Sequence, residues 1–501
     1  MSISISLLEK ELTSLNQNKI YFSDYFEIDT SIVKGYGALD ISLLNDLPLF
    51  IDPFLIFCSQ DPTCRAMHDE IIKYLVYLRD RAKRKETPSK AELIYLFCFP
   101  EVKQNYLGFC QHGNSGSGLG TDFGRALYYG LKDIFQDFGE EQITKGHHIE
   151  KVCLLKEGVG KDNISDFITN LIKPFLLSYT EQFAKRYLRK EQCATFNISR
   201  ARFDYDYEVW RSEPYYLPKH NDDYVLLTPT NLLVRDDIWI NRANMIHDFN
   251  IFAESIPDEV LRDRVNAYFN QVLARESMQK DREKAAELTI REFPELIDYY
   301  IRYREDHDAE ALAQSISEVT GVEQVFIKQV IQLVDELKEK TAFYQVRATN
   351  AFDEALERVK YLKHVIEDCD GYRYFYDGET PIHRESDLHI MYRLVSYDTI
   401  SDVNSEVNNG RGAVDFKYSR GRKDKVLIEF KLARTLKRNL EKQVAVYQAA
   451  DEQPPAITVI LFFSDDEMKK VNKILNDLGL QGKAGIVVID ARNNKVQASK
   501  A

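Results

Sequence analysis

Several features that would mark other classes of protein are missing from this 501-residue chain. The seven cysteines are widely spaced and form no CxxC pair, so they fit reduced thiols better than a disulfide framework or a zinc site. No GxSxG or HExxH motif occurs, so there is no serine-hydrolase elbow and no zinc-protease helix. We see no repeat of fixed period and no low-complexity tract.

Long hydrophobic runs are also missing. The most apolar N-terminal run, LPLFIDPFLIF, is too short to span a bilayer and is interrupted by Asp52 and Pro53. The opening residues, MSISISLLEKELTS, lack the basic and apolar regions of a signal peptide. We therefore expect a cytoplasmic protein that does not associate with a membrane.

The chain has too little positive charge to coat nucleic acid indiscriminately. Its 66 lysines and arginines are outnumbered by 79 acidic residues, which gives a net charge of -13. Any contact with DNA or RNA must therefore come from a local basic patch. With 44% hydrophobic residues the chain can bury a sizeable core, and its length favours two or three domains.

The hydrophobic pattern divides the chain into three regions and predicts an α/β fold class. Residues 1–250 mix helix-like and strand-like segments, and residues 251–375 repeat apolar positions at helical spacing. We interpret the first as a sensing or regulatory region and the second as a helical connector. Residues 376–501 alternate between helix and strand, with a helix over 385–397, strands over 413–419 and 426–432, and a helix over 434–451. Strands over 457–463 and 485–490 follow, with a helix between them.

The most informative stretch is residues 405–450. The alternation of a strand over 426–432 puts Glu429 and Lys431 on one face and Val426, Ile428 and Phe430 on the other. Asp415 lies on the preceding strand, and the SRGRKD turn would bring it alongside as a hairpin. We therefore expect Asp415, Glu429 and Lys431 to converge on one site. On the following helix, Gln443 stands one turn from Tyr447.

These residue types suit phosphodiester hydrolysis, which needs charge neutralisation on the phosphate and an activated water. Carboxylates are ligands that Mg²⁺ prefers. A lysine two residues further on can orient the attacking water and counter charge on the phosphate.

On these residues, the segment over roughly 380–501 resembles the PD-(D/E)XK nuclease superfamily, which has a restriction-endonuclease-like fold. The resemblance implies a central mixed sheet and catalytic roles for Asp415, Glu429, Lys431, Glu406 and Gln443. It implies Mg²⁺ (with Mn²⁺ as a substitute) held by Asp415, Glu429 and Glu406. Glu406 matches the acid of the first helix, and it is preferred to Glu385 because it stands closest to the Asp415 strand. Ala413-Val414 replaces the proline that often precedes the aspartate.

The basic residues around the motif suggest the partner. Nucleic acid is expected to bind through Arg411, Lys417, Arg420, Arg422, Arg434, Lys437 and Arg438. DNA is favoured over RNA, and a homo-oligomer is expected. The sequence also resembles nuclease domains of bacterial anti-phage defence proteins, which implies a defence effector whose N-terminal region senses a phage-derived or nucleic-acid trigger. The alternative is a catalytically inactive nucleic-acid-binding or assembly protein that retains the fold.

Two weaker signals lie upstream. The glycine-rich stretch 111–127 lacks the GKS/GKT ending of a P-loop, and a flexible loop is the preferred interpretation. Residues 146–170 gather titratable groups at His147, His148, Glu150, Glu157, Asp162 and Asp166. For Asp162 and Asp166, helix-capping and turn roles are favoured over a second catalytic or metal site.

Overall fold

The computed structural model describes residues 19–84, 86–108, 119–154, 161–274, 279–396, 402–408, 413–420, 424–436 and 456–494. It divides into two compact units, and each is described by itself. The first unit is made mainly of residues up to Val319, and the second mainly of residues from Thr320 onward. Helices and mixed sheets occur together, so the α/β class predicted from the sequence is confirmed.

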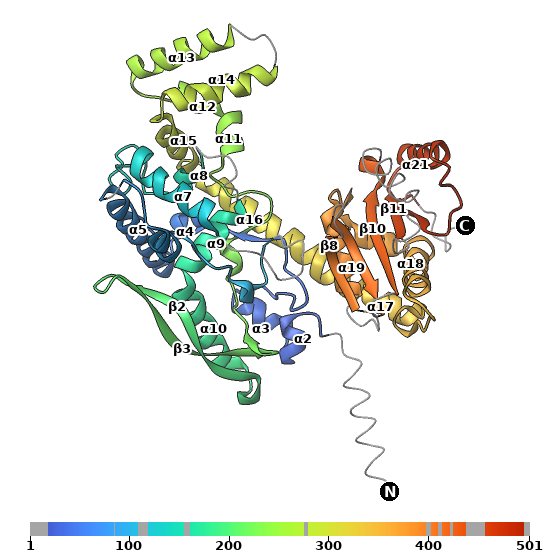
Figure 1. Ribbon diagram of the computed structural model, residues 1–501. Coiled ribbons are helices and arrows are strands. Elements are labelled where there is room, and N and C mark those ends of the chain that lie inside the picture. The colour runs from blue at the N-terminus through green and yellow to red at the C-terminus, as the bar shows by residue number, and fades with distance from the viewer. Residues whose placement is uncertain are drawn as a thin grey trace. The chain divides into compact units, whose positions relative to one another are not determined.

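The first unit is mostly helical (Figure 1). Its longest helix is α5 (Pro62–Lys83), which begins where the Asp61 carboxylate accepts a hydrogen bond from the Thr63 amide. The other helices are α2 (Phe22–Phe26), α3 (Thr30–Gly35), α4 (Pro53–Cys58), α6 (Lys90–Glu92), α7 (Thr121–Tyr129), α8 (Lys151–Leu154), α9 (Lys161–Leu171), α10 (Lys173–Tyr187), α11 (Arg242–His247), α12 (Phe249–Glu254), α13 (Glu259–Leu273), α14 (Gln279–Glu292), α15 (Leu296–Glu305) and α16 (Asp308–Glu323).

A long antiparallel hairpin is the main sheet element of this unit. Strand β2 (Cys193–Asp204) pairs with β3 (Val209–His220), which continues to the short β4 (Asp223–Tyr224). The Asp204 carboxylate accepts hydrogen bonds from the amides of Asp206 and Tyr207, which closes the turn. The separate strands β1 (Phe50–Ile51) and β5 (Leu233–Val234) also pair antiparallel. The sequence pattern did not predict the long hairpin.

The described part of residues 251–375 is helical, as the apolar spacing predicts. These helices do not form one body of their own, because the division between the two units falls within α16. Helices α17 (Val330–Lys340) and α18 (Ala351–Asp368) belong to the second unit, together with the C-terminal sheet.

The second unit is built on a five-stranded mixed sheet. The strands are β8 (Asp402–Asn408), β9 (Ala413–Ser419), β10 (Lys425–Leu432), β11 (Ala456–Phe462) and β12 (Ile486–Asp490), and they lie in chain order. β9 is antiparallel to both of its neighbours, whereas β10, β11 and β12 run parallel. The predicted hairpin between β9 and β10 is confirmed, and the Arg420 amide donates to the Asp424 carbonyl across its turn at 2.9 Å.

The two faces of this sheet differ. Val426, Ile428 and Phe430 are buried on what we call the Ile428 face, beneath α18 and α19 (Glu385–Val395), and α17 packs against these two helices. Tyr392 of α19 packs its ring on Phe430 there, with 4.5 Å between ring centroids. The opposite side, which we call the Glu429 face, is covered near β11 and β12 by α21 (Asp465–Asp477) through Val471 and Leu475 (Figure 1).

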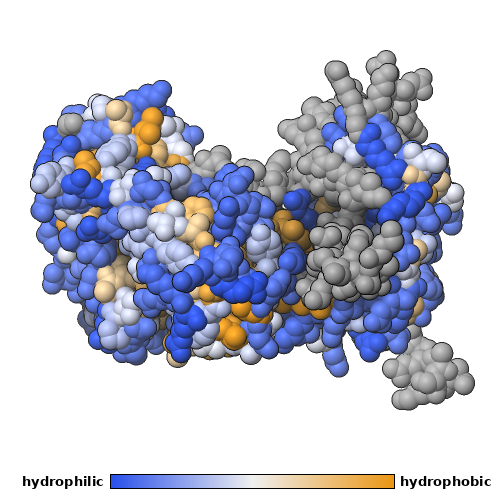
Figure 2. All heavy atoms as spheres, turned by 90° about the horizontal axis from the view of Figure 1, so that it is seen from below, coloured by the Kyte–Doolittle hydropathy of each residue, from blue (hydrophilic) through white to orange (hydrophobic). Residues whose placement is uncertain are grey.

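The visible surface is mostly hydrophilic, with apolar residues in small groups (Figure 2). Among the helices that the structure describes, none combines the length and apolar character needed to cross a membrane. The cysteines with described side chains are free thiols, at positions 58, 64, 98, 193 and 369.

Candidate functional site

Strand β10 presents Glu429 and Lys431 on one face, as its alternation predicts. Val426, Ile428 and Phe430 are each at most 2% exposed, whereas Leu427 and Glu429 between them are partly exposed. Lys431 shares the face of Glu429 but is only 7% exposed. A charged side chain buried this deeply needs a partner.

The register of the three neighbouring strands aligns the carboxylates. Phe416 of β9 pairs with Ile428 of β10, so one further step along both strands sets Asp415 opposite Glu429. On the other side, Ser405 pairs with Phe416 and Val407 with Val414, which sets Glu406 opposite Asp415. The backbone therefore carries Glu406, Asp415 and Glu429 at adjoining register positions. The side chains of Glu406 and Asp415 lie outside the described residues.

The charged partner of Lys431 is Glu385, the first residue of α19. Glu385 Oε2 lies 3.5 Å from Lys431 Nζ. Glu385 Oε1 accepts a hydrogen bond from the Leu432 amide at 3.3 Å and another from the Thr435 hydroxyl. A carboxylate in the first turn of a helix also benefits from the positive end of the helix dipole.

This geometry changes which residue is the acid contributed by the first helix of the expected nuclease fold. Glu406 was expected to come from the first helix, but it lies on strand β8. The helix preceding the sheet is α19, and its acid at the site is Glu385. Closeness to Asp415 in the sequence was the wrong criterion, because the N-terminus of α19 reaches the end of β10 directly.

Two hydroxyl residues beside the site were not predicted. Thr435 donates to Glu385, and Thr458 of β11 pairs in register with Glu429 and is 1% exposed. Thr458 could have been found from the sequence, because it is the one polar residue in the apolar strand ITVILF and a buried hydroxyl needs a hydrogen-bond partner.

Arg420 is engaged within the fold, although it was expected to bind nucleic acid. Its Nε donates to Glu354 Oε2 on α18 at 2.9 Å, and its Nη1 donates to the Ala348 carbonyl. Glu354 is fully buried and also pairs with the buried Arg358. Because these contacts occupy the guanidinium, we remove Arg420 from the expected nucleic-acid surface.

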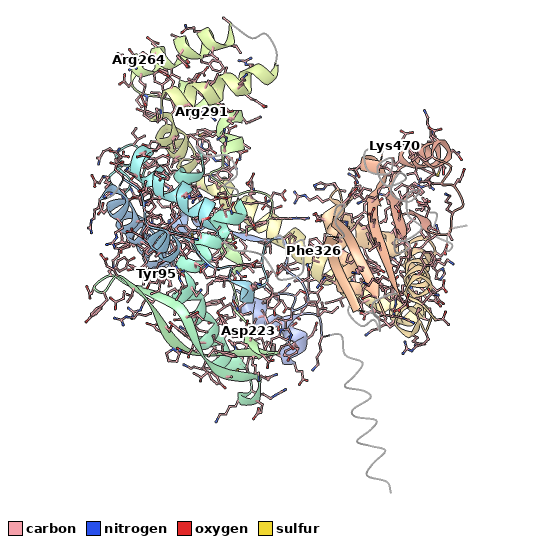
Figure 3. The ribbon with its side chains drawn as sticks, in the orientation of Figure 1. Tyr95, Asp223, Arg264, Arg291, Phe326 and Lys470 are labelled. Atoms are coloured by element: carbon pink, nitrogen blue, oxygen red, sulfur yellow. The ribbon has the colours of Figure 1, made fainter. Side chains whose placement is uncertain are left out.

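Arg434 and Lys417 differ in their surroundings. Arg434 Nη2 donates to the Ile382 carbonyl at 3.0 Å. Lys470 of α21, which is labelled in Figure 3, donates to the Arg434 carbonyl at 2.8 Å. Lys417 is partly exposed on β9, two residues from Asp415 and in register with Leu427. Of the predicted basic set, Lys417 is therefore the described side chain best placed beside the carboxylates.

Other predicted positions lie outside the described residues. These are Arg411, Arg422, Lys437, Arg438, Gln443 and Tyr447. Within the part of the chain whose side chains are described, no group of three or more His, Cys, Asp or Glu side chains is placed to hold a metal ion.

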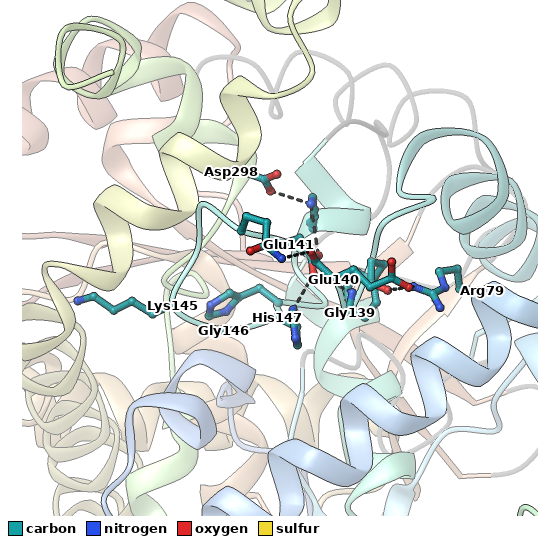
Figure 4. Close-up of polar contacts among 12 residues, drawn as sticks. Arg79, Gly139, Glu140, Glu141, Lys145, Gly146, His147 and Asp298 are labelled. Carbon is teal, nitrogen blue, oxygen red and sulfur yellow. Dashed lines mark hydrogen bonds and ion pairs between the residues drawn. The ribbon is translucent and has the colours of Figure 1, made fainter. Parts of the chain in front are cut away.

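The upstream histidines belong to a buried polar network in the first unit (Figure 4). His147 Nδ1 lies 2.6 Å from Glu141 Oε2, and Lys151 lies between Glu141 and Asp298 at 3.3 and 2.7 Å. Burial has the largest single effect and would raise the pKa of Glu141, but the Lys151 ammonium, backbone hydrogen bonds and His147 together lower it. His148 Nε2 lies 2.9 Å from Glu305. These contacts tie α15 to residues 141–151.

The acids further along form a different group. Asp162 and Asp166 lie on α9, whereas Glu157 is outside the described residues. Burial, followed by the nearby carboxylates of Asp162 and Glu101, raises the pKa of Asp166 to about 7. The titratable residues of 146–170 are thus divided between the 141–151 segment and helix α9. Those that the structure describes do not form a single second site.

Two segments match known families. Residues 27–241 match the family described as Domain of unknown function (DUF8370), and residues 351–465 match Domain of unknown function (DUF8371). No curated protein and no solved structure matches the chain. The second match begins at Ala351, the first residue of α18, and contains Glu385, Glu429 and Lys431. It therefore joins α18 to the sheet that carries the site.

Proposed function

We propose that the second unit is a metal-dependent nuclease that hydrolyses phosphodiester bonds. The observation that carries this proposal is the register of β9 and β10, in which Phe416 pairs with Ile428, so that the next facing positions along the strands are those of Asp415 and Glu429, two residues before the buried Lys431. Such a set of hard oxygen donors next to an ammonium suits a divalent cation and a phosphate together.

Asp415 and Glu429 would hold Mg²⁺ (or Mn²⁺), with Glu406 as a further donor at the adjoining position. When bound, the ion supplies charge neutralisation at the phosphate and lowers the pKa of a bound water. Lys431 Nζ orients the attacking water and counters negative charge on the phosphate. Glu385 holds Lys431 in place at 3.5 Å, and Gln443 is proposed to hydrogen-bond the water or a carboxylate.

The proposed substrate is nucleic acid, with DNA favoured over RNA. Lys417 stands on the same strand as Asp415 and is available to contact a phosphate, and Arg411, Arg422, Arg434, Lys437 and Arg438 complete the proposed basic patch. The net charge of -13 means that this local patch must supply the attraction, so binding should weaken steeply with salt.

We further propose that the chain is a cytoplasmic effector of bacterial anti-phage defence that acts as a homo-oligomer. The first unit, which is larger than the nuclease unit, would sense a trigger or restrain the nuclease. The alternative is an inactive protein that binds nucleic acid with the same sheet.

Cleavage assays decide between these two functions. The full chain is incubated with supercoiled plasmid and, separately, with structured RNA, in Mg²⁺, Mn²⁺ or EDTA. We expect cleavage of the plasmid with either cation, none in EDTA, and loss of cleavage in Glu429→Gln. Binding without cleavage under every metal condition, including with candidate triggers added, would support the inactive alternative.

A further inference from the structure

A second candidate site lies wholly in the first unit and includes none of the residues of the proposed nuclease. A pocket of about 780 Å³ opens between the end of α3, the start of α5, α10 and residues 229–232. This volume is within the range of small-molecule sites, and four separate chain segments contribute to it. Neither the matched families nor the nuclease proposal assigns it a role.

One wall of this pocket is a rigid set of aromatic rings. Phe175 and Tyr179 stack at 5.7 Å between centroids with 26° between their planes, and Tyr36 lies 4.5 Å from Tyr179. Tyr36 donates its hydroxyl to the Tyr179 carbonyl at 2.9 Å, and Tyr179 donates to the Tyr36 carbonyl at 3.0 Å. This reciprocal pair fixes both rings before a ligand arrives, which limits the entropy lost on binding.

The charge of the lining excludes phosphate as the recognised group. Asp61 is the one charged residue that lines the pocket, and neither lysine nor arginine contributes to it within the described chain. Asp61 also caps the N-terminus of α5 through the Thr63 amide at 2.8 Å, so an acidic side chain occupies the anion-attracting end of that helix. An anionic ligand would meet a carboxylate with no cation to offset it.

The rim offers uncharged polar groups of the kind that read a planar heterocycle. Gln182 on α10 and Asn231 within the short 3-10 helix Thr230–Leu232 are both exposed, and their amides make no hydrogen bond with another described residue. A carboxamide presents a donor and an acceptor side by side, which matches the adjacent donor and acceptor on a nucleobase edge. Aromatic rings stack on any base through its flat face.

From these features we propose that this pocket binds an uncharged nucleobase or nucleoside, stacked on the Phe175–Tyr179–Tyr36 wall and hydrogen-bonded by Gln182 and Asn231. The site is separate from the nuclease, so the two proposals stand or fall independently.

The test is isothermal titration of the full chain with adenosine, guanosine, cytidine and thymidine, alongside their 5′-monophosphates and ribose. We expect at least one nucleoside to bind with a Kd on the order of 0.1 mM, given the size of the ligand. Its monophosphate should bind at least about fivefold more weakly because of Asp61, and ribose should not bind.

Variants then locate the binding. Phe175→Leu keeps an apolar side chain but removes the stacking ring, and it should weaken binding about tenfold. Gln182→Ala and Asn231→Ala should each weaken it about threefold to tenfold. Gln271→Ala, an exposed glutamine on α13 outside the pocket, is the matched control and should change the Kd less than twofold.

Three results would overturn the proposal. These are no binding by any nucleoside at millimolar concentration, tighter binding of the monophosphate or ribose, and unchanged affinity in both amide variants. The amide variants keep the test decisive should Phe175→Leu fail to fold, because both amides are exposed.

Discussion

Lys431 combines a charge with an exposure of only 7%, an arrangement that the fold supports through Glu385. We expect Lys431→Ala to lower the rate of plasmid cleavage by on the order of 10² or more, because in the proposed reaction the lysine acts on the water and phosphate. Substrate binding should change little, and the variant should remain folded. Lys469→Ala, an exposed lysine on α21, is the control and should cleave normally.

A Lys431 variant that cleaves at the wild-type rate would show that the lysine is not part of the reaction. Since alanine leaves Glu385 without its cation, Lys431→Met is the companion variant. Methionine fills most of the same space without the charge, so a folded and inactive Met variant separates catalysis from packing.

Glu385 is the second residue-scale test. Glu385→Gln keeps an acceptor for the Leu432 amide and the Thr435 hydroxyl, but it removes the negative charge beside Lys431. We expect cleavage to fall about tenfold or more with the fold retained, in line with the loss of one charge-assisted contact. Glu379→Gln, an exposed acid outside the site, should cleave like the wild type. Equal rates for both variants would argue against a positioning role for Glu385.

Asp166 makes the first unit sensitive to pH. Its folded pKa of about 7 lies above the ordinary 3.8, so the folded state holds a proton that the unfolded state has released between these values. The stability contributed by this group is therefore fully present below about pH 4 and is lost as the pH rises through 7.

Asp166→Asn removes this titration. By calorimetry of the full chain, we expect the variant to unfold a few degrees above the wild type at pH 8 and close to it at pH 4. Asp206→Asn, at the exposed tip of the β2–β3 hairpin, is the control and should not change the unfolding temperature at either pH. If the unfolding temperatures of Asp166→Asn and the wild type differ by the same amount at both pH values, titration of Asp166 is not the cause.

For single residues, the sequence predicted correctly which side chains share a strand face, but it did not predict which distant residues contact them. Alternation alone placed Glu429 and Lys431 together, since strand geometry requires it. It could not show that the N-terminus of α19 reaches the end of β10, so Glu406 was preferred to Glu385. Arg420 was assigned to the nucleic-acid surface because its partner Glu354 is 66 residues away and no local pattern connects them.

At the scale of elements, α18 anchors the β9–β10 hairpin. The Asp424 carboxylate accepts from the Ala351 amide at the start of α18 at 3.0 and 3.1 Å, while Arg420 reaches Glu354 one turn further along. Glu354 and Arg358 are fully buried, so the hairpin is joined to the helix through a buried ionic group.

Arg420 and Lys417 should therefore behave differently. We expect Arg420→Ala to lower the free energy of unfolding by about 1–3 kcal/mol, because it leaves the buried Glu354 with one cation fewer. Lys417→Ala should leave stability unchanged and reduce the slope of log affinity against log salt for duplex DNA by about 0.9. Each variant is the other's control, and denaturant unfolding with salt-dependent binding measures both. The opposite pattern would return Arg420 to the nucleic-acid surface.

Elements with a strong local pattern were predicted, and those fixed by distant partners were not. The alternating or continuous apolar runs of β9, β10, β11 and β12 all correspond to strands, and α19 and α21 lie where their apolar spacing indicates. Strand β8, with the sequence DVNSEVN, has few apolar residues and was missed because its strand character comes from pairing with β9.

At the scale of the whole molecule, the second unit, which we propose to be a nuclease, is larger than the sequence suggested. A domain starting at residue 376 would omit α18, which packs on the sheet, and α17, which packs against α18 and α19. Without α18, Lys363 no longer bonds the Val488 carbonyl of β12 and Glu367 no longer accepts from the Asp490 amide, at 2.6 and 2.8 Å. The family match that begins at Ala351 agrees with including this helix.

The last prediction concerns restraint of the nuclease by the first unit. Residues 320–501 retain α17, α18 and the sheet, so this fragment should fold, whereas residues 376–501 should not, because apolar side chains such as Ile428 and Phe430 lose their cover. If the first unit restrains the nuclease, the 320–501 fragment should cleave plasmid faster and be more toxic on expression than the full chain. The same fragment with Lys431→Ala is the control for toxicity unrelated to cleavage.

A folded 320–501 fragment that is no more active or toxic than the intact protein would contradict restraint. Loss of activity in a folded full chain with His147, His148 and Asp166 replaced by alanine, alongside full activity in Lys431→Ala, would instead move the active site to the first unit.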